Sequence, residues 1–238
     1  MAIGAVALSA TVFGEVSSAN IVGYQGTALE AEKYYMVAVQ FDAVGAEGAG
    51  TAIKNLVTGE LPYGIELSVL KTDGTYDIYK YIAEAYDEGI DDFIPGWADG
   101  GENMATRQLQ PGTVFWLKAP SATNVTIAGQ VLGDASKEFA IPGGKYSMLG
   151  NPYPVAANPN ALTWTGLTYK DELSVLKADG TYDIYKYIEE AYDEEADDFI
   201  PGWADGGENL ITVGVMPVGK GAWIKPAADL TVTFASPL

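Results

Sequence analysis

The chain has 238 residues, of which 48% are hydrophobic, and its 32 acidic and 13 basic residues give a formal net charge of −19. It contains no cysteine and no histidine, which excludes disulfides, thiolate metal sites and the commonest general base and zinc ligand. Such an acidic chain repels nucleic acids and anionic lipids, because those polyanions are bound by clustered lysine and arginine. We therefore expect no nucleic-acid partner.

The N-terminal residues have the pattern of an export signal. Residues 2–12 are small and apolar, and small side chains at 17–19 precede Asn20. This predicts a signal peptide over residues 1–19 and a protein that is secreted or held at the cell surface. The alternative is a retained apolar arm in which alternate residues from Val6 to Val12 share one face, so that the arm adds a strand to a neighbouring subunit. The segment is too short for a membrane-spanning helix, and no membrane span is expected.

The next elements are mostly predicted strands. Residues 35–41 form one, residues 51–57 are a candidate short helix, and residues 67–70 and 76–82 form a hairpin around Asp73-Gly74. Two further strands are expected at 114–118 and 125–131. About six short strands per unit, without helical periods between them, favour a small β-sandwich or barrel over a parallel α/β fold.

The strongest pattern in the chain is an internal duplication. Residues 66–103 recur at 172–209 with 34 of 38 positions identical, and weaker similarity extends in both directions. Each copy is long enough to be a domain of its own. The sequence therefore predicts an all-β protein with two tandem homologous domains, at residues 20–132 and 133–238.

Several short motifs resemble those of a group of secreted tandem-repeat β proteins from planctomycete- and verrucomicrobia-type bacteria. They are the Ala19-Asn20-Ile21-Val22-Gly23-Tyr24 start, the Asp73-Gly74-Thr75-Tyr76 hairpin, Gly96-Trp97, and the Pro-Gly-x-x-Phe-Trp motif at 111–116. The resemblance covers most of both units. It implies export and β structure, and it implies no particular activity.

The duplicated segments are densely acidic. They hold 22 of the 32 acids, and carboxylates from loops are the ligands that Ca²⁺ prefers. One hypothesis is therefore a Ca²⁺ site in each unit, formed by Asp87, Asp91, Asp92 and Asp99 and by Asp193, Asp197, Asp198 and Asp205. No EF-hand pattern is present, and the alternative is a solvated acidic loop without metal.

Aromatic residues crowd the same segments. Exposed tyrosine and tryptophan can stack on sugar rings or anchor a protein partner, and the alternative is that the rings fill the core. The predicted interaction residues are Tyr79, Tyr81, Trp97, Tyr185, Tyr187 and Trp203.

No catalytic motif is present, so the sequence predicts a non-enzyme with no catalytic residues and no required cofactor. Export and duplication favour an extracellular structural protein that assembles with itself into a filament, surface layer or matrix. The alternative is a secreted carbohydrate- or surface-binding module, with Ca²⁺-stabilised acidic loops and a polysaccharide partner. Two equal surfaces on one chain would give such a module avidity.

Overall fold

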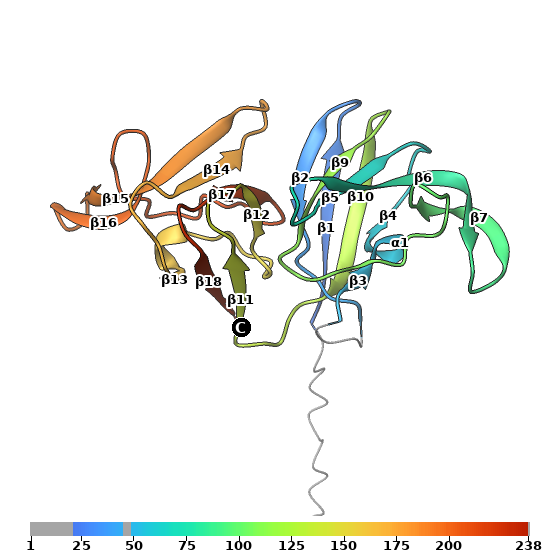
Figure 1. Ribbon diagram of the computed structural model, residues 1–238, viewed down its shortest axis with the longest axis horizontal. Helices are drawn as coiled ribbons and strands as arrows, with labels where there is room; N and C mark the ends of the chain where they lie inside the picture. The colour runs from blue at the N-terminus through green and yellow to red at the C-terminus, as the bar shows by residue number, and fades with distance from the viewer. Residues whose placement is uncertain (1–20, 45–48, 238) are drawn as a thin grey trace, which may run out of the picture.

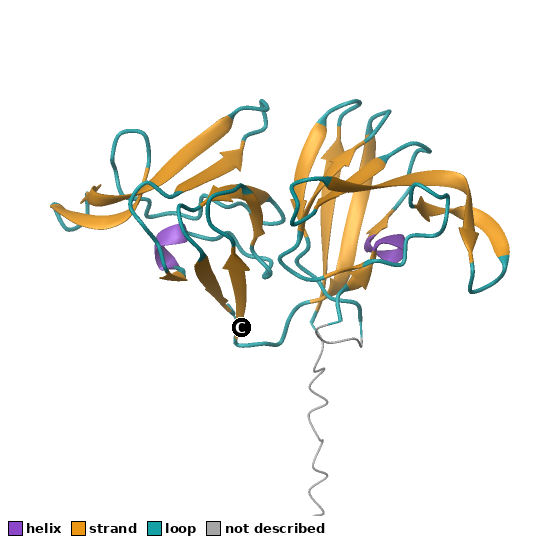
Figure 2. Ribbon diagram, in the orientation of Figure 1, coloured by secondary structure: helices purple, strands orange, loops and turns teal. Residues whose placement is uncertain are grey.

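The computed structural model describes residues 21–44 and 49–237, and it consists almost entirely of antiparallel β-sheet (Figures 1 and 2). The all-β prediction is confirmed. The predicted signal peptide or apolar arm at residues 1–19 lies outside the described residues. Within those residues, no helix has the length and apolarity needed to cross a membrane.

Residues 21–132, called the first unit here, form a three-stranded sheet of order β1-β10-β4, a five-stranded sheet of order β2-β9-β5-β6-β7, and a β3-β8 pair. The predicted short helix is present as the single turn α1. The elements are β1 (Val22–Leu29), β2 (Tyr34–Ala38), β3 (Thr51–Ala52), α1 (Ile53–Leu56), β4 (Val57–Thr58), β5 (Glu66–Leu70), β6 (Tyr76–Asp87), β7 (Asp92–Ala98), β8 (Gln108–Leu109), β9 (Val114–Lys118) and β10 (Thr123–Gln130).

Residues 133–237, the second unit, repeat this arrangement. Their three-stranded sheet has the order β11-β18-β13, and their five-stranded sheet has the order β12-β17-β14-β15-β16. The duplication in the sequence is therefore also a duplication of strand order. The elements are β11 (Ser136–Ile141), β12 (Ser147–Gly150), the 3₁₀ turn η1 (Pro159–Ala161), β13 (Thr163–Thr165), β14 (Glu172–Leu176), β15 (Tyr182–Asp193), β16 (Asp198–Ala204), β17 (Gly221–Lys225) and β18 (Leu230–Ala235).

The Asp-Gly hairpin forms as predicted. Strands β5 and β6 pair from Glu66 opposite Lys80 to Leu70 opposite Tyr76. The backbone N–H of Thr75 donates to the Asp73 carboxylate at 2.9 Å, and Gly74 has a φ of +85°, a conformation that favours glycine. These local interactions position the start of β6, and the same turn recurs between β14 and β15.

The acidic segment that follows is a loop only at residues 88–91 and 99–102, and the rest of it lies in strands, which corrects the sequence interpretation. β6 continues for 12 residues to Asp87 and pairs with β7, with a bulge between Ile82 and Ala85. The two strands accommodate this acidic sequence because most of their acids are exposed to water, while Ala85 of β6 and Trp97 of β7 are buried. The two long hairpins, β6–β7 and β15–β16, extend to opposite ends of the molecule (Figure 1).

Each unit has its own hydrophobic core between its two main sheets. In the first unit, Val125 and Ile127 of β10 lie in one cluster with Leu67 and Phe115 of the five-stranded sheet. In the second, Val232 and Phe234 of β18 pack in the same way with Leu173 and Ile224. Two sheets around one core agree with the predicted small sandwich.

A third apolar cluster joins the two units. The indole rings of Trp116 and Trp223 lie 6.4 Å apart, and Met36 and Met148 belong to the same cluster. The alignment of the repeats makes Trp116 equivalent to Trp223 and Met36 equivalent to Met148. Each unit thus contributes the same patch to the contact.

Glycines allow the backbones to approach at this contact. A Cβ on Gly150 would lie 2.8 Å from the Cβ of Ala38, and a Cβ on Gly221 would lie 2.4 Å from Cγ1 of Val114. Both are contacts between equivalent positions of the two copies. A contact in which residues meet their own equivalents has two-fold pseudo-symmetry and is closed, so it cannot be repeated along a filament.

Candidate functional site: an aromatic groove between the units

Strand register directs one row of side chains away from the core of each unit. Trp116 pairs with Met36 on one side and with Ser68 on the other, and Ser68 pairs with Ile78. Residues one step along each strand, such as Phe115 and Leu67, point into the core. The second unit has the same outward row, composed of Met148, Trp223, Ser174 and Ile184.

Each outward row carries an aromatic pair next to a lysine. The rings of Tyr34 and Trp116 meet edge to face at 6.2 Å, and those of Tyr146 and Trp223 do so at 6.1 Å. The Lys118 ammonium lies 5.5 Å from the Tyr34 ring centre. The two tyrosines are 60% and 50% exposed, so each pair offers ring surface to a ligand.

The outward faces border a groove of about 1230 Å³ between the units. Tyr34, Tyr76 and Trp116 line it from the first unit, and Tyr182 with the β14–β15 turn lines it from the second. A shallower hollow of about 420 Å³ lies beside it, over the outward face of the second unit. Its lining is Tyr146, Glu172, Ser174, Tyr182, Ile184 and Trp223. Tyr182 borders both, so the groove and the hollow adjoin at this ring.

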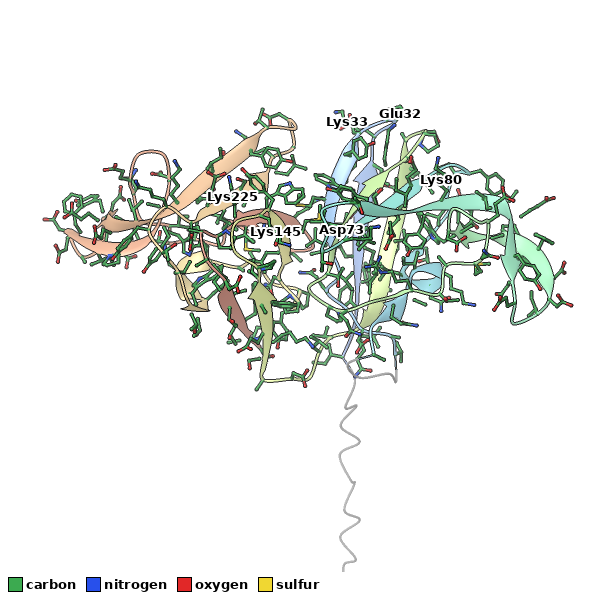
Figure 3. The ribbon with its side chains drawn as sticks, in the orientation of Figure 1. Glu32, Lys33, Asp73, Lys80, Lys145 and Lys225 are labelled. Carbon is green, nitrogen blue, oxygen red and sulfur yellow. The ribbon has the colours of Figure 1, made fainter. Side chains whose placement is uncertain are left out.

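Lysine side chains come from both units: Lys33 of the first unit lines the groove, and the Lys225 ammonium of the second lies 5.0 Å from the ring centre of Tyr146 (Figure 3). The Lys145 ammonium donates to the carbonyl oxygen of Thr72 at 3.1 Å, which connects the second unit to the first hairpin turn. This hydrogen bond is a polar contact between the units, in addition to their apolar cluster.

The groove is electrically balanced although the chain is strongly acidic. Its lining holds three lysines (Lys33, Lys177 and Lys220) and three acids (Glu30, Asp179 and Asp183). Lys33 pairs with Glu30 at 2.6 Å, and Lys177 pairs with Asp183 at 3.2 Å. The net charge of −19 is therefore carried outside the groove.

The predicted interaction tryptophans are core residues, and that prediction is wrong for them. Trp97 and Trp203 are each 1% exposed and belong to the two main clusters. The reason is that alternate side chains of a strand point to opposite faces of the sheet, and Trp97 and Trp203 lie on the face that packs against the core. Tyr79 is 8% exposed and is also part of the core.

The other predicted rings sit at the margin of the cores. Tyr81 lies between Tyr63, stacked at 5.8 Å, and Trp97, edge-on at 5.9 Å. Tyr187 is held in the same way by Tyr169 and Trp203, and Tyr185 packs against the second core. None of the six predicted rings lines the groove. Tyr34, Tyr76, Trp116 and Tyr182 line it instead. They were missed because the sequence of a strand does not indicate which of its two faces is covered.

The eight predicted calcium ligands are engaged in turns. Asp99 accepts hydrogen bonds from the backbone N–H groups of Gly101 and Asn103, and Asp205 repeats this with Gly207 and Asn209. Asp91 and Asp197 accept from tyrosine hydroxyls five residues earlier. The backbone N–H groups next to or near Asp87, Asp92, Asp193 and Asp198 donate to those four carboxylates.

In residues 21–44 and 49–237, no three acidic side chains come together in a way that could hold a metal ion. The structure therefore gives the predicted calcium ligands no preformed site. Their density in the sequence reflects a repeated use of aspartate to cap turns.

The turn aspartates predict a pH dependence of stability. Hydrogen bonds from the hydroxyl and then the backbone N–H of Thr181 hold the pKa of Asp179 below its ordinary value of 3.8. A carboxyl whose pKa is lower in the folded state stabilises the fold above the unfolded pKa, and this contribution is lost as the pH falls through the folded pKa. The urea midpoint of Asp179→Ala should lie below that of wild type at pH 6, and the two should converge towards pH 3.

Thr181→Val is the matched variant for this test, since it removes the hydroxyl donor and keeps the backbone donor. Its urea midpoint should also converge with that of wild type towards pH 3, from a smaller difference at pH 6. If the urea midpoints of Asp179→Ala and wild type differed by the same amount at pH 6 and at pH 3, the charge of Asp179 would not contribute to stability.

No known family model matches the chain, and no curated protein or solved structure is significantly similar to it. The assignment of a function to the groove therefore rests on the chemistry of its own residues.

Proposed function

We propose that this protein is an extracellular binding protein that holds a polysaccharide chain in the groove between its two units. The observation that carries the proposal is the convergence of Tyr34, Tyr76, Trp116 and Tyr182 on one groove. Aromatic faces pack against the apolar C–H faces of sugar rings, while hydroxyls and charged groups at the rim hydrogen-bond the sugar hydroxyls.

The charge distribution supports a ligand of low charge. The groove is balanced, whereas the whole chain at −19 repels any densely anionic polymer. The groove and the neighbouring hollow present equivalent aromatic pairs, Tyr34 with Trp116 and Tyr146 with Trp223. A polymer long enough to contact both pairs gains avidity that a short oligosaccharide lacks.

The test is binding of Tyr76→Ala to immobilised neutral polysaccharides by affinity electrophoresis. Tyr76 is 37% exposed and makes none of the aromatic pairs found among the described residues, so its removal should leave the fold intact. The loss of one stacking ring should weaken binding roughly tenfold, which corresponds to about 1.4 kcal/mol.

Tyr24→Ala is the matched control, because Tyr24 is 81% exposed on β1 and does not line the groove. Its mobility in the gel should equal that of wild type. Equal weakening by both variants, or no retention of wild type on any glucan, mannan, xylan or chitin tested, would contradict the proposal.

Self-assembly is a second candidate, and the observation that favours it is the edge strand β1. This strand pairs with β10 only, within the described residues, and its eight residues include no charge and no proline. Val22 and Tyr24 on it are 61% and 81% exposed. Uncharged, exposed edge strands can pair with other chains.

Assembly of this kind would use β1 and not the contact between the units, which is closed. A retained arm at residues 1–19 would extend the same edge, and calcium at the hairpin tips remains a separate prediction. Light scattering across a concentration series, with and without Ca²⁺, tests the assembly, because a wild-type chain that stays monomeric throughout excludes it.

A further inference from the structure

We propose that Lys220 is a selectivity-determining residue that binds an anionic substituent, a carboxylate or a sulfate, on the polysaccharide. This inference rests on the proposed function. It adds that the bound polymer carries occasional acidic groups on an otherwise uncharged backbone.

Lys220 is the groove lysine without an acidic partner in the described part of the chain. The ammonium groups of Lys33 and Lys177 are engaged by Glu30 and Asp183. Lys220 is half-buried at the groove and lies 5.8 Å from the ring centre of Tyr35. No carboxylate lies within 4.0 Å of its nitrogen among the described residues. It is therefore a charge available to a ligand.

The backbone that carries Lys220 is fixed against the first unit. The Gly219 carbonyl oxygen accepts a hydrogen bond from the backbone N–H of Ala38 at 3.0 Å, and the N–H of Lys220 donates to Pro217 at 3.0 Å. Gly219 has a φ of +68°, and a Cβ there would overlap the side-chain amide of Gln25. A fixed backbone reduces the entropy lost when the lysine binds a ligand.

The surroundings favour an anion at this point. Burial lowers the pKa of Lys220, because the ammonium is partly removed from water without a compensating charge. A carboxylate or sulfate brought in by the ligand supplies that charge and forms a charge-assisted hydrogen bond, which is stronger than one between neutral groups.

Only the second copy has a lysine at this position. The alignment that makes Trp116 equivalent to Trp223 places Thr113 opposite Lys220. The groove thus has one uncompensated lysine and not a symmetric pair, which suits a polymer with isolated acidic groups and not a polyanion.

The experiment compares a neutral glucan with the same glucan after light carboxymethylation, both measured by titration calorimetry with the full chain. Wild type should bind the carboxymethylated glucan about tenfold more tightly, the range of one charged hydrogen bond. Lys220→Gln should bind both forms equally, with the affinity of wild type for the neutral form. Lys220→Arg should retain a preference for the charged form.

Lys54→Gln is the matched control, because Lys54 pairs with Asp87 and does not line the groove. It should keep the tenfold preference. Equal binding of the two glucans by wild type, or equal loss of preference in both glutamine variants, would overturn the role of Lys220 and leave polysaccharide binding in place. Absence of binding to the neutral and the carboxymethylated forms of glucan, mannan, xylan and chitin alike would overturn both proposals.

Discussion

Replacing Trp97 by alanine is expected to lower the free energy of unfolding by about 3–5 kcal/mol, the usual cost of deleting a buried large aromatic side chain. Trp97 is 1% exposed, its ring meets Tyr81 at 5.9 Å, and its indole N–H donates to the Val57 carbonyl at 3.4 Å. The loss leaves a cavity between the two sheets of the first unit. Urea unfolding followed by tryptophan fluorescence and circular dichroism measures the effect.

Tyr24→Ala is again the control, and a change within about 0.5 kcal/mol is expected for so exposed a residue. Under conditions where the Trp97 variant remains folded, its polysaccharide affinity should equal that of wild type. A variant with wild-type stability that no longer bound ligand would restore Trp97 as a contact residue and contradict its assignment to the core.

Replacing Gly150 by valine is expected to separate the two units. A Cβ at this position would lie 2.8 Å from the Cβ of Ala38, from a side-chain methyl of Val114 and from the Gly112 carbonyl oxygen. Gly150 has no positive φ and lies in strand β12, so valine suits its backbone and the cost falls on the contact between the units. Overpacking of this kind costs about 1–3 kcal/mol.

The expected results for this variant are a larger radius of gyration in X-ray scattering and loss of polysaccharide binding, with an unchanged circular dichroism spectrum. Gly26→Val is the matched control, since Gly26 lies in strand β1 and a Cβ there meets nothing within 4 Å. If the Gly150 variant kept both the scattering profile and the affinity of wild type, the groove would not depend on the contact between the units.

Much of the fold could be predicted from local sequence. The Asp73-Gly74 turn between two β-prone runs identified the first hairpin, because its backbone requirements are met within four residues. The length of β6 was underestimated, because the acidic residues beyond Ile82 are typical of a loop. They are accommodated in a strand since pairing with β7 satisfies the backbone and leaves most carboxylates in water.

The site could be predicted less well. Tyr76 and Tyr79 are three residues apart on one strand, and both are equally suited to a core or to a binding face. Tyr79 is buried in one cluster with Val125 and Ile127 of β10, a strand of the other sheet that lies far away in the sequence. Local alternation indicates that the two rings differ and does not indicate which one is exposed.

The sequence by itself determined the all-β class, the duplication, the first hairpin of each copy and the acidic character of the chain. Only the tertiary structure decided which aromatic face is covered and that the uncovered faces of the two copies meet at Trp116 and Trp223. The physical reason is that strand alternation is a local property, whereas burial is decided by the surface that packs against the strand. The two copies contact each other through the same apolar patch around Trp116 and Trp223, and the groove lies beside that contact.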